Sequence, residues 1–206
     1  MKRSLLVLCL AAAIALPWQA GILGQAAEKK PDNQLPERFR AFVTNLGDVR
    51  TTADNRMVEM QISRWTTEEE EQKLFEALKE KGPRAMLSVM QGLPATGWIR
   101  SQGGLSYDLR YARQAAGKEG GRQITLMTDR QMNFWELQSA TVSRDYPYTV
   151  VRLATNKEGK WEGSMTIATK IELQAGILVF EDLSTRPVQL MSITHEKKNE
   201  KNNEKK

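Results

Sequence analysis

The stretch WEGSMTIATKIEL, residues 161–173, carries the clearest strand pattern in the chain. Apolar and polar side chains alternate along it, and this period of two is typical of a strand with one dry face and one wet face. One face carries Trp161, Gly163, Met165, Ile167, Thr169, Ile171 and Leu173. The other face carries Glu162, Ser164, Thr166, Ala168, Lys170 and Glu172. The stretch therefore predicts one long antiparallel strand.

Strand and turn signals continue on both sides of this stretch. The glycine-rich segment 117–121 and the turn residues 156–159 each lie between two apolar runs, which predicts two hairpins. We expect the remaining strands at 39–46, 56–65, 97–100, 107–112, 122–128, 133–139, 148–155, 177–183 and 188–194.

Residues 67–92 have a different character and predict two helices. Thr66 or Thr67 is a suitable N-cap, and Glu69 or Glu70 three residues later completes a capping box. The acidic run at 68–71 suits a helix N-terminus, where exposed amides favour negative charge. The pair Gly82-Pro83 ends the first helix and begins the second.

These elements predict an α+β fold, mainly an antiparallel curled sheet or barrel-like meander of about nine strands. The two helices form an insertion after the second strand, and we expect them to cap one end of the barrel. This order of elements is similar to that of small lipid-binding barrels with a helix-turn-helix lid, a likeness of topology without a shared motif. The expected domain plan is a signal peptide at 1–26, a linker at 27–36, one β-rich domain at 37–195 and a disordered charged tail at 196–206.

The N-terminus predicts export. Lys2 and Arg3 precede the apolar run Leu5–Leu16, and the small-x-small triplet Gly24-Gln25-Ala26 follows. That order is typical of a secretory signal peptide cleaved near Ala26, and it favours a periplasmic or secreted protein. The apolar run alone falls short of the roughly 20 residues of a bilayer span, which favours cleavage. An uncleaved N-terminal anchor is the alternative, because counting on to Leu23, with Pro17 and Gln19 included, approaches that length.

Cysteine usage supports a bacterial envelope or secreted protein. The single cysteine, Cys9, lies within the signal, so the mature chain has none. Disulfides, thiolate zinc sites and cysteine nucleophiles are therefore excluded from the mature protein.

The net charge gives no sign of nucleic acid as a partner. The formal charge is +5, but Lys2 and Arg3 leave with the signal and the tail holds five Lys against three Glu. The folded body is therefore nearly neutral, whereas nucleic-acid binding needs a dense basic face on the domain itself.

No familiar catalytic or cofactor motif occurs in the sequence. The only histidine, His195, lies next to the tail, and we expect a solvated strand-end residue that cannot serve a catalytic triad. The glycine-rich segments match neither a P-loop nor a dinucleotide-binding fingerprint. We therefore predict no catalytic residue, no metal site and no cofactor.

Carboxylates are the only remaining source of acid–base chemistry. The candidates are Asp108, Asp129, Glu136, Asp145, Glu181 and Asp182. A surface ion pair with Arg110 is the simpler interpretation of Asp108, and turn or solvent positions are the simpler interpretation of the others. Two of these acids would have to converge in a cleft, roughly 5–10 Å apart, to hydrolyse a glycosidic bond.

Apolar and aromatic side chains supply the candidate ligand-binding residues. They are Met86, Met90, Trp98, Tyr107, Tyr111, Trp135 and Trp161. Methionine-rich surfaces suit adaptable binding of apolar ligands, and core packing is the competing interpretation.

Two functional hypotheses follow from the sequence. The first is an exported, non-catalytic domain that binds an apolar small molecule or an envelope protein. The alternative is a hydrolase with paired carboxylates that acts on an envelope or extracellular polymer.

Overall fold

The computed structural model describes residues 35–44, 56–117, 121–132, 147–156, 158–174, 177–182 and 187–197. The predicted signal peptide, most of the linker, the expected strand at 133–139 and the chain beyond 197 lie outside these residues. Across the described ranges, no helix is both long enough and apolar enough to cross a membrane.

The described residues form nine strands and two helices. In chain order they are β1 (Glu37–Thr44), β2 (Arg56–Ile62), α1 (Glu68–Lys81), α2 (Pro83–Gly92), β3 (Gly97–Ser101), β4 (Ser106–Ala116), β5 (Arg122–Thr128), β6 (Tyr148–Thr155), β7 (Trp161–Gln174), β8 (Ile177–Asp182) and β9 (Val188–Lys197). The helices follow the second strand, as predicted.

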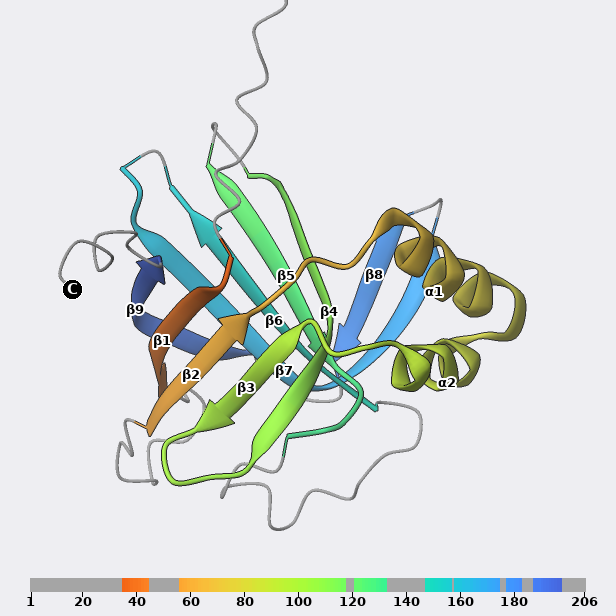
Figure 1. Cartoon of the computed structure of the whole chain (residues 1–206), viewed down its shortest axis with the longest axis horizontal. Helices are drawn as coiled ribbons and strands as arrows, with labels where there is room; N and C mark the ends of the chain where they lie inside the picture. Colours follow the sequence, from red (N-terminus) through yellow and green to blue (C-terminus); the bar gives the residue numbers. More distant parts are fainter. Residues whose placement is uncertain are drawn as a thin grey trace, which may run out of the picture. The chain divides into compact units, whose positions relative to one another are not determined.

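Eight of the strands close into an antiparallel barrel (Figure 1). Each strand from β1 to β6 pairs with the next strand in the chain. This includes β2 and β3, although α1 and α2 lie between them in sequence. β9 pairs with both β1 and β7, and β7 pairs with β6 to complete the ring. β8 pairs with the second half of β7, outside the ring. The predicted α+β fold with a barrel-like antiparallel meander is therefore confirmed.

Two separate apolar clusters stabilise this arrangement. The first fills the barrel with inward-facing side chains such as Phe39, Met60, Leu126 and Met165. The second lies on the outer surface of the barrel wall, where Leu74, Leu78, Met86 and Met90 of the helices pack on β4, β5, β6 and β7. The helical pair therefore covers one side of the barrel and does not cap its end as expected.

Two β-bulges create the wall surface on which the helices pack. The register of β4 against β5 shifts between Leu109 and Tyr111, and that of β7 against β6 shifts between Thr166 and Thr169. One extra residue in a strand reverses which face the following residues occupy. Tyr111 consequently faces the helices whereas Leu109 faces the barrel interior.

The β7 bulge corrects the prediction of one continuous dry face. Met165 lies in the barrel cluster, but Ile171 and Leu173 lie in the cluster beneath the helices. The period of two is therefore interrupted once, and the same strand serves two cores on opposite faces.

The helix boundaries follow the predicted local signals. Thr67 caps α1, because its hydroxyl accepts a hydrogen bond from the Glu70 amide at 3.2 Å while the Glu70 carboxylate accepts one from the Thr67 amide at 3.0 Å. Gly82 separates the helices at φ +80°, a backbone conformation that favours glycine.

Candidate functional site

A buried ion cluster closes one end of the barrel. Glu37 begins β1, faces the interior and has no exposed side-chain surface. The Arg122 guanidinium, at the start of β5, donates two parallel hydrogen bonds to its carboxylate, at 2.6 and 2.8 Å. The Arg122 Nε also donates to Gln114 Oε1 at 2.9 Å. The pair joins strands that lie 85 residues apart in sequence.

His195 belongs to the same cluster, contrary to the prediction of a solvated residue. Its Nε2 lies 2.8 Å from Glu37 Oε2, and its side chain is 11% exposed. The imidazole stacks on Phe39 with ring centroids 4.5 Å apart and meets the edge of Trp161 at 5.4 Å.

A third bulge explains why His195 faces inward. The register of β1 against β9 shifts between Arg40 and Phe42, and Ser192 at φ 49° marks the irregularity on β9. Leu190 before the bulge and His195 after it therefore face the interior, although strict alternation would place them on opposite faces. β9 also continues to Lys197, so His195 is paired in the sheet and not at its frayed end.

The negative charge of Glu37 is balanced within the cluster by Arg122, so its carboxylate is poorly suited to acid–base catalysis. Burial raises the pKa of Glu37, but contacts with His195 and Arg122 outweigh burial and hold the pKa below its ordinary value. Both carboxylate oxygens already contact a cation or imidazole, so Glu37 is a poor general base. We interpret the cluster as the part that fixes the ends of β1, β5 and β9.

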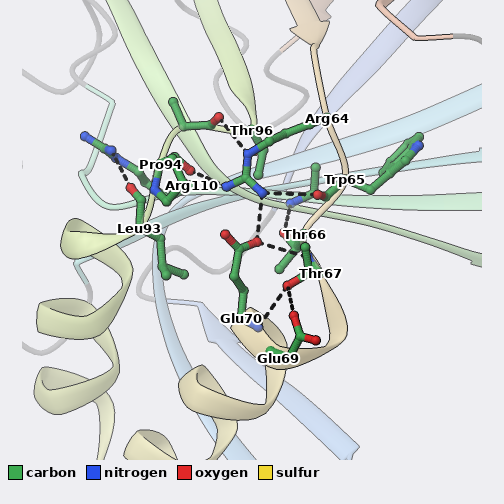
Figure 2. A network of polar contacts seen from close by, with 12 residues as sticks. Arg64, Trp65, Thr66, Thr67, Glu69, Glu70, Leu93, Pro94, Thr96 and Arg110 are labelled. Carbon is green, nitrogen blue, oxygen red and sulfur yellow. Dashed lines mark hydrogen bonds and ion pairs between the residues drawn. The ribbon is translucent and has the colours of Figure 1, made fainter.

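A second polar network ties the helical pair to the barrel (Figure 2). The Arg64 guanidinium donates to the Glu70 carboxylate at 2.8 Å, to the Pro94 carbonyl at 2.6 Å and to the Ala95 carbonyl at 3.2 Å. The hydrogen bond from Arg64 is the main cause that lowers the pKa of Glu70. One side chain thus joins the first turn of α1 to the segment after α2. This role is structural.

Two of the candidate acids do come together, at Arg110. Its guanidinium lies 2.9 Å from Asp108 Oδ2 and 3.8 Å from Asp129 Oδ2, and it donates to the Leu93 carbonyl at 2.8 Å. The predicted ion pair between Asp108 and Arg110 is therefore present. The guanidinium lies between the two carboxylates, where a hydrolase would have to place the bond that it cleaves.

The other candidate acids give no converging pair among the described residues. Glu181 is exposed and pairs with Lys170 across β7 and β8 at 3.2 Å. Glu136 and Asp145 lie outside the described residues, as does the side chain of Asp182. Within the part of the chain that the structure describes, no group of three or more His, Cys, Asp or Glu gathers as a metal site would require.

A concavity of about 640 Å³, with both polar and apolar surface, lies on the outer wall of the barrel, where β5, β6, β7 and β9 run side by side. The small side chains of Ala154 and Ser164 lie among longer polar ones. The lining residues are Gly117, Gln123, Arg152, Leu153, Ala154, Thr155, Asn156, Glu162, Gly163, Ser164, Pro187 and Gln189. No sequence signal marks this surface, because its residues are ordinary strand and turn positions until the sheet closes and brings four strands together.

The buried cluster and the concavity meet at the barrel end. The backbone amide of Arg122 donates to Thr155 Oγ1 at 2.8 Å, and Thr155 lines the concavity. Trp161, which contacts His195, immediately precedes Glu162 on β7. The cluster therefore supports the strand ends that shape this surface.

The predicted ligand-binding residues do not form one site in the described structure. Met86, Met90 and Tyr111 are buried between the helices and the wall, where Tyr111 donates a 2.5 Å hydrogen bond to Glu71. Tyr107 and Trp161 pack against the barrel cluster. Trp98 is half-buried beneath the Arg100 guanidinium at 4.8 Å, and Trp135 lies outside the described residues.

Comparisons with protein-family models, with curated proteins and with solved structures found no match for this chain.

Proposed function

We propose that this chain is an exported, non-catalytic binding domain that takes its ligand or partner on the outer wall of the barrel. The signal-like N-terminus supports export to the periplasm or the medium. The concavity between β5 and β9 carries the binding proposal, because concave surfaces with a few convergent polar groups are the usual small-ligand sites.

Two further observations favour the outer wall over other locations. The barrel interior is occupied by buried side chains from all eight strands of the ring, including Phe39, Ile62, Ile99 and Leu153. The described carboxylates with buried or half-buried side chains, such as Glu37, Glu59 and Asp129, face arginine guanidinium groups. Those pairings weigh against a hydrolase with paired carboxylates.

Sedimentation with envelope material tests this proposal. The mature protein is mixed with an envelope fraction and centrifuged, and the bound share is compared among variants. Ser164→Tyr fills the centre of the concavity and should reduce the bound share at least tenfold, whereas Gln102→Tyr in the exposed β3–β4 turn should leave it unchanged. Equal binding by both variants, or no binding by the unmodified protein, would refute the proposal.

An apolar patch supports a second candidate, an envelope protein partner. Phe42 on β1 and Met191 on β9 are 41% and 52% exposed, and they lie directly opposite each other. Met57 of β2 lies opposite Phe42 on its other side. Met57 is half-buried, so the exposed part of this row is Phe42 and Met191, and adjacent exposed apolar side chains are typical of interaction surfaces. Phe42→Ser would weaken envelope sedimentation on this second model, while Ser164→Tyr would not.

A further inference from the structure

The concavity on the outer wall combines polar and apolar surface and has no net formal charge. Among its lining residues, Arg152 and Glu162 are the only charged side chains, and their formal charges cancel. We propose that the concavity binds a neutral oligosaccharide, that is, a segment of a glycan chain. This inference rests on the proposed function and names its ligand class.

The hydrogen-bonding groups of the concavity fit sugar hydroxyls. Each hydroxyl both donates and accepts, so a complementary surface needs both kinds of group. Gln123 and Gln189 supply amides that do both, Ser164 supplies a hydroxyl, Arg152 only donates and Glu162 only accepts. Among the described residues, the side chains of Gln123, Ser164 and Gln189 have no hydrogen-bond partner, so they are available to a ligand.

The groups lie in rows that the sheet register fixes. Ser164 is directly opposite Arg152 on one side and Gln189 on the other, while Ala154 is opposite both Gln123 and Glu162. Strand pairing fixes the backbone positions of these residues before a ligand arrives, so binding orders their side chains but not the chain itself. Small residues in the middle of each row leave room for a ligand between the longer side chains.

The apolar part of the surface suits the carbon face of a sugar ring. The exposed ring of Pro187 lines the concavity beside the polar groups. Next to it, the Arg152 guanidinium lies 4.3 Å from the centroid of the Phe180 ring, and this contact orients its donors. The volume of about 640 Å³ falls within the usual range of small-ligand sites.

Other ligand classes fit this surface less well. Phosphate-rich polymers and anionic lipid need an excess of basic side chains. The concavity has no such excess, because its one basic side chain, Arg152, is balanced by Glu162. An apolar ligand would leave the amides and charged groups without partners. An extended peptide commonly binds by adding a strand to an open sheet edge, but β5, β6, β7 and β9 each pair with strands on both sides.

An NMR titration of the full-length mature protein tests the ligand class. Two neutral tetrasaccharides serve as probes, one of glucose and one of N-acetylglucosamine, with a sulfated heparin tetrasaccharide as the anionic comparison. At least one neutral probe should bind with Kd below about 1 mM, and the amide shifts should centre on β5, β6, β7 and β9. Gln123→Ala and Gln189→Ala should each weaken binding about fivefold, the usual effect of one lost hydrogen bond. Gln91→Ala, an exposed amide on α2, is the matched control and should not change Kd.

The outcomes separate this inference from the proposed function. Binding of neither neutral probe, tighter binding of the heparin probe, or shifts centred elsewhere would overturn the oligosaccharide assignment. If envelope sedimentation still depends on Ser164 in that case, the outer-wall function stands and only the ligand class is wrong. If sedimentation is also absent, both proposals fail.

Discussion

Replacement of Glu37 by glutamine tests the buried ion cluster at the barrel end. Glutamine keeps the size of the side chain but replaces one acceptor oxygen by an NH₂ group, which cannot accept the second Arg122 hydrogen bond. The Arg122 charge, on a side chain only 18% exposed, then lacks its counter-ion. Removing one partner of a buried ion pair costs about 3–5 kcal/mol of the free energy of unfolding. We expect the lower end of that range, about 3 kcal/mol, because Arg122 keeps some contact with water.

Glu59→Gln provides a control matched in residue type and in arginine contacts. The Glu59 carboxylate accepts hydrogen bonds from Arg100 and Arg40, but those two side chains are 51% and 40% exposed. Exposed ion pairs contribute about 0–1 kcal/mol. Urea unfolding followed by tryptophan fluorescence and by circular dichroism gives both free energies, because Trp65 and Trp161 lie beside the cluster.

The effect of Glu37→Gln on the free energy of unfolding should depend on pH. The folded-state pKa of Glu37 lies below its ordinary value of 4.5, so its ionisation stabilises the fold above pH 4.5, and this contribution is lost as the pH falls through the lowered pKa. The stability difference between the unmodified protein and Glu37→Gln should therefore shrink below pH 4.5. A cost no larger than that of Glu59→Gln at pH 7, or a difference that does not change with pH, would refute this account of the cluster.

Three further predictions follow from the structure. Arg64→Ala removes the hydrogen bonds to Glu70, Pro94 and Ala95, so we expect a loss of about 2–3 kcal/mol in the free energy of unfolding. Amide hydrogen exchange should become faster in α1 and α2 than in the barrel, and an equal increase in both would contradict this prediction. Gly163→Ala places a methyl group 2.8 Å from Leu153 Cδ2 and 3.0 Å from both the Arg152 carbonyl oxygen and Ile193 Cδ1. We expect denaturant unfolding to show a loss of about 1–3 kcal/mol in the free energy of unfolding. An unchanged free energy would contradict this, because it would mean that the neighbouring atoms move aside at no cost. Intact mass of the exported protein should show a chain that begins near Ala27, whereas retention of residues 1–26 would favour the membrane-anchor alternative.

Local sequence patterns determined the elements and their order. The capping box at Thr67 and Glu70 and the Gly82-Pro83 pair set the helix boundaries, because caps act within one turn of the chain. Alternation and turn residues placed the described strands to within a few residues, because strand signals are also local. An antiparallel meander with a helical insertion follows from that order, since neighbours in sequence tend to pair in space.

Tertiary structure decided which face each residue occupies beyond a bulge. The shifts near Tyr111, Thr169 and Ser192 reverse the alternation, and no local pattern announced them, because a bulge is stabilised by what packs on the re-aimed side chains. For that reason the helices lie on the wall, and His195 lies inside the barrel. The ion cluster and the concavity were also hidden in the sequence. Glu37 meets Arg122 only because the ring closes, and four strands align their polar residues only once β9 pairs with both β1 and β7.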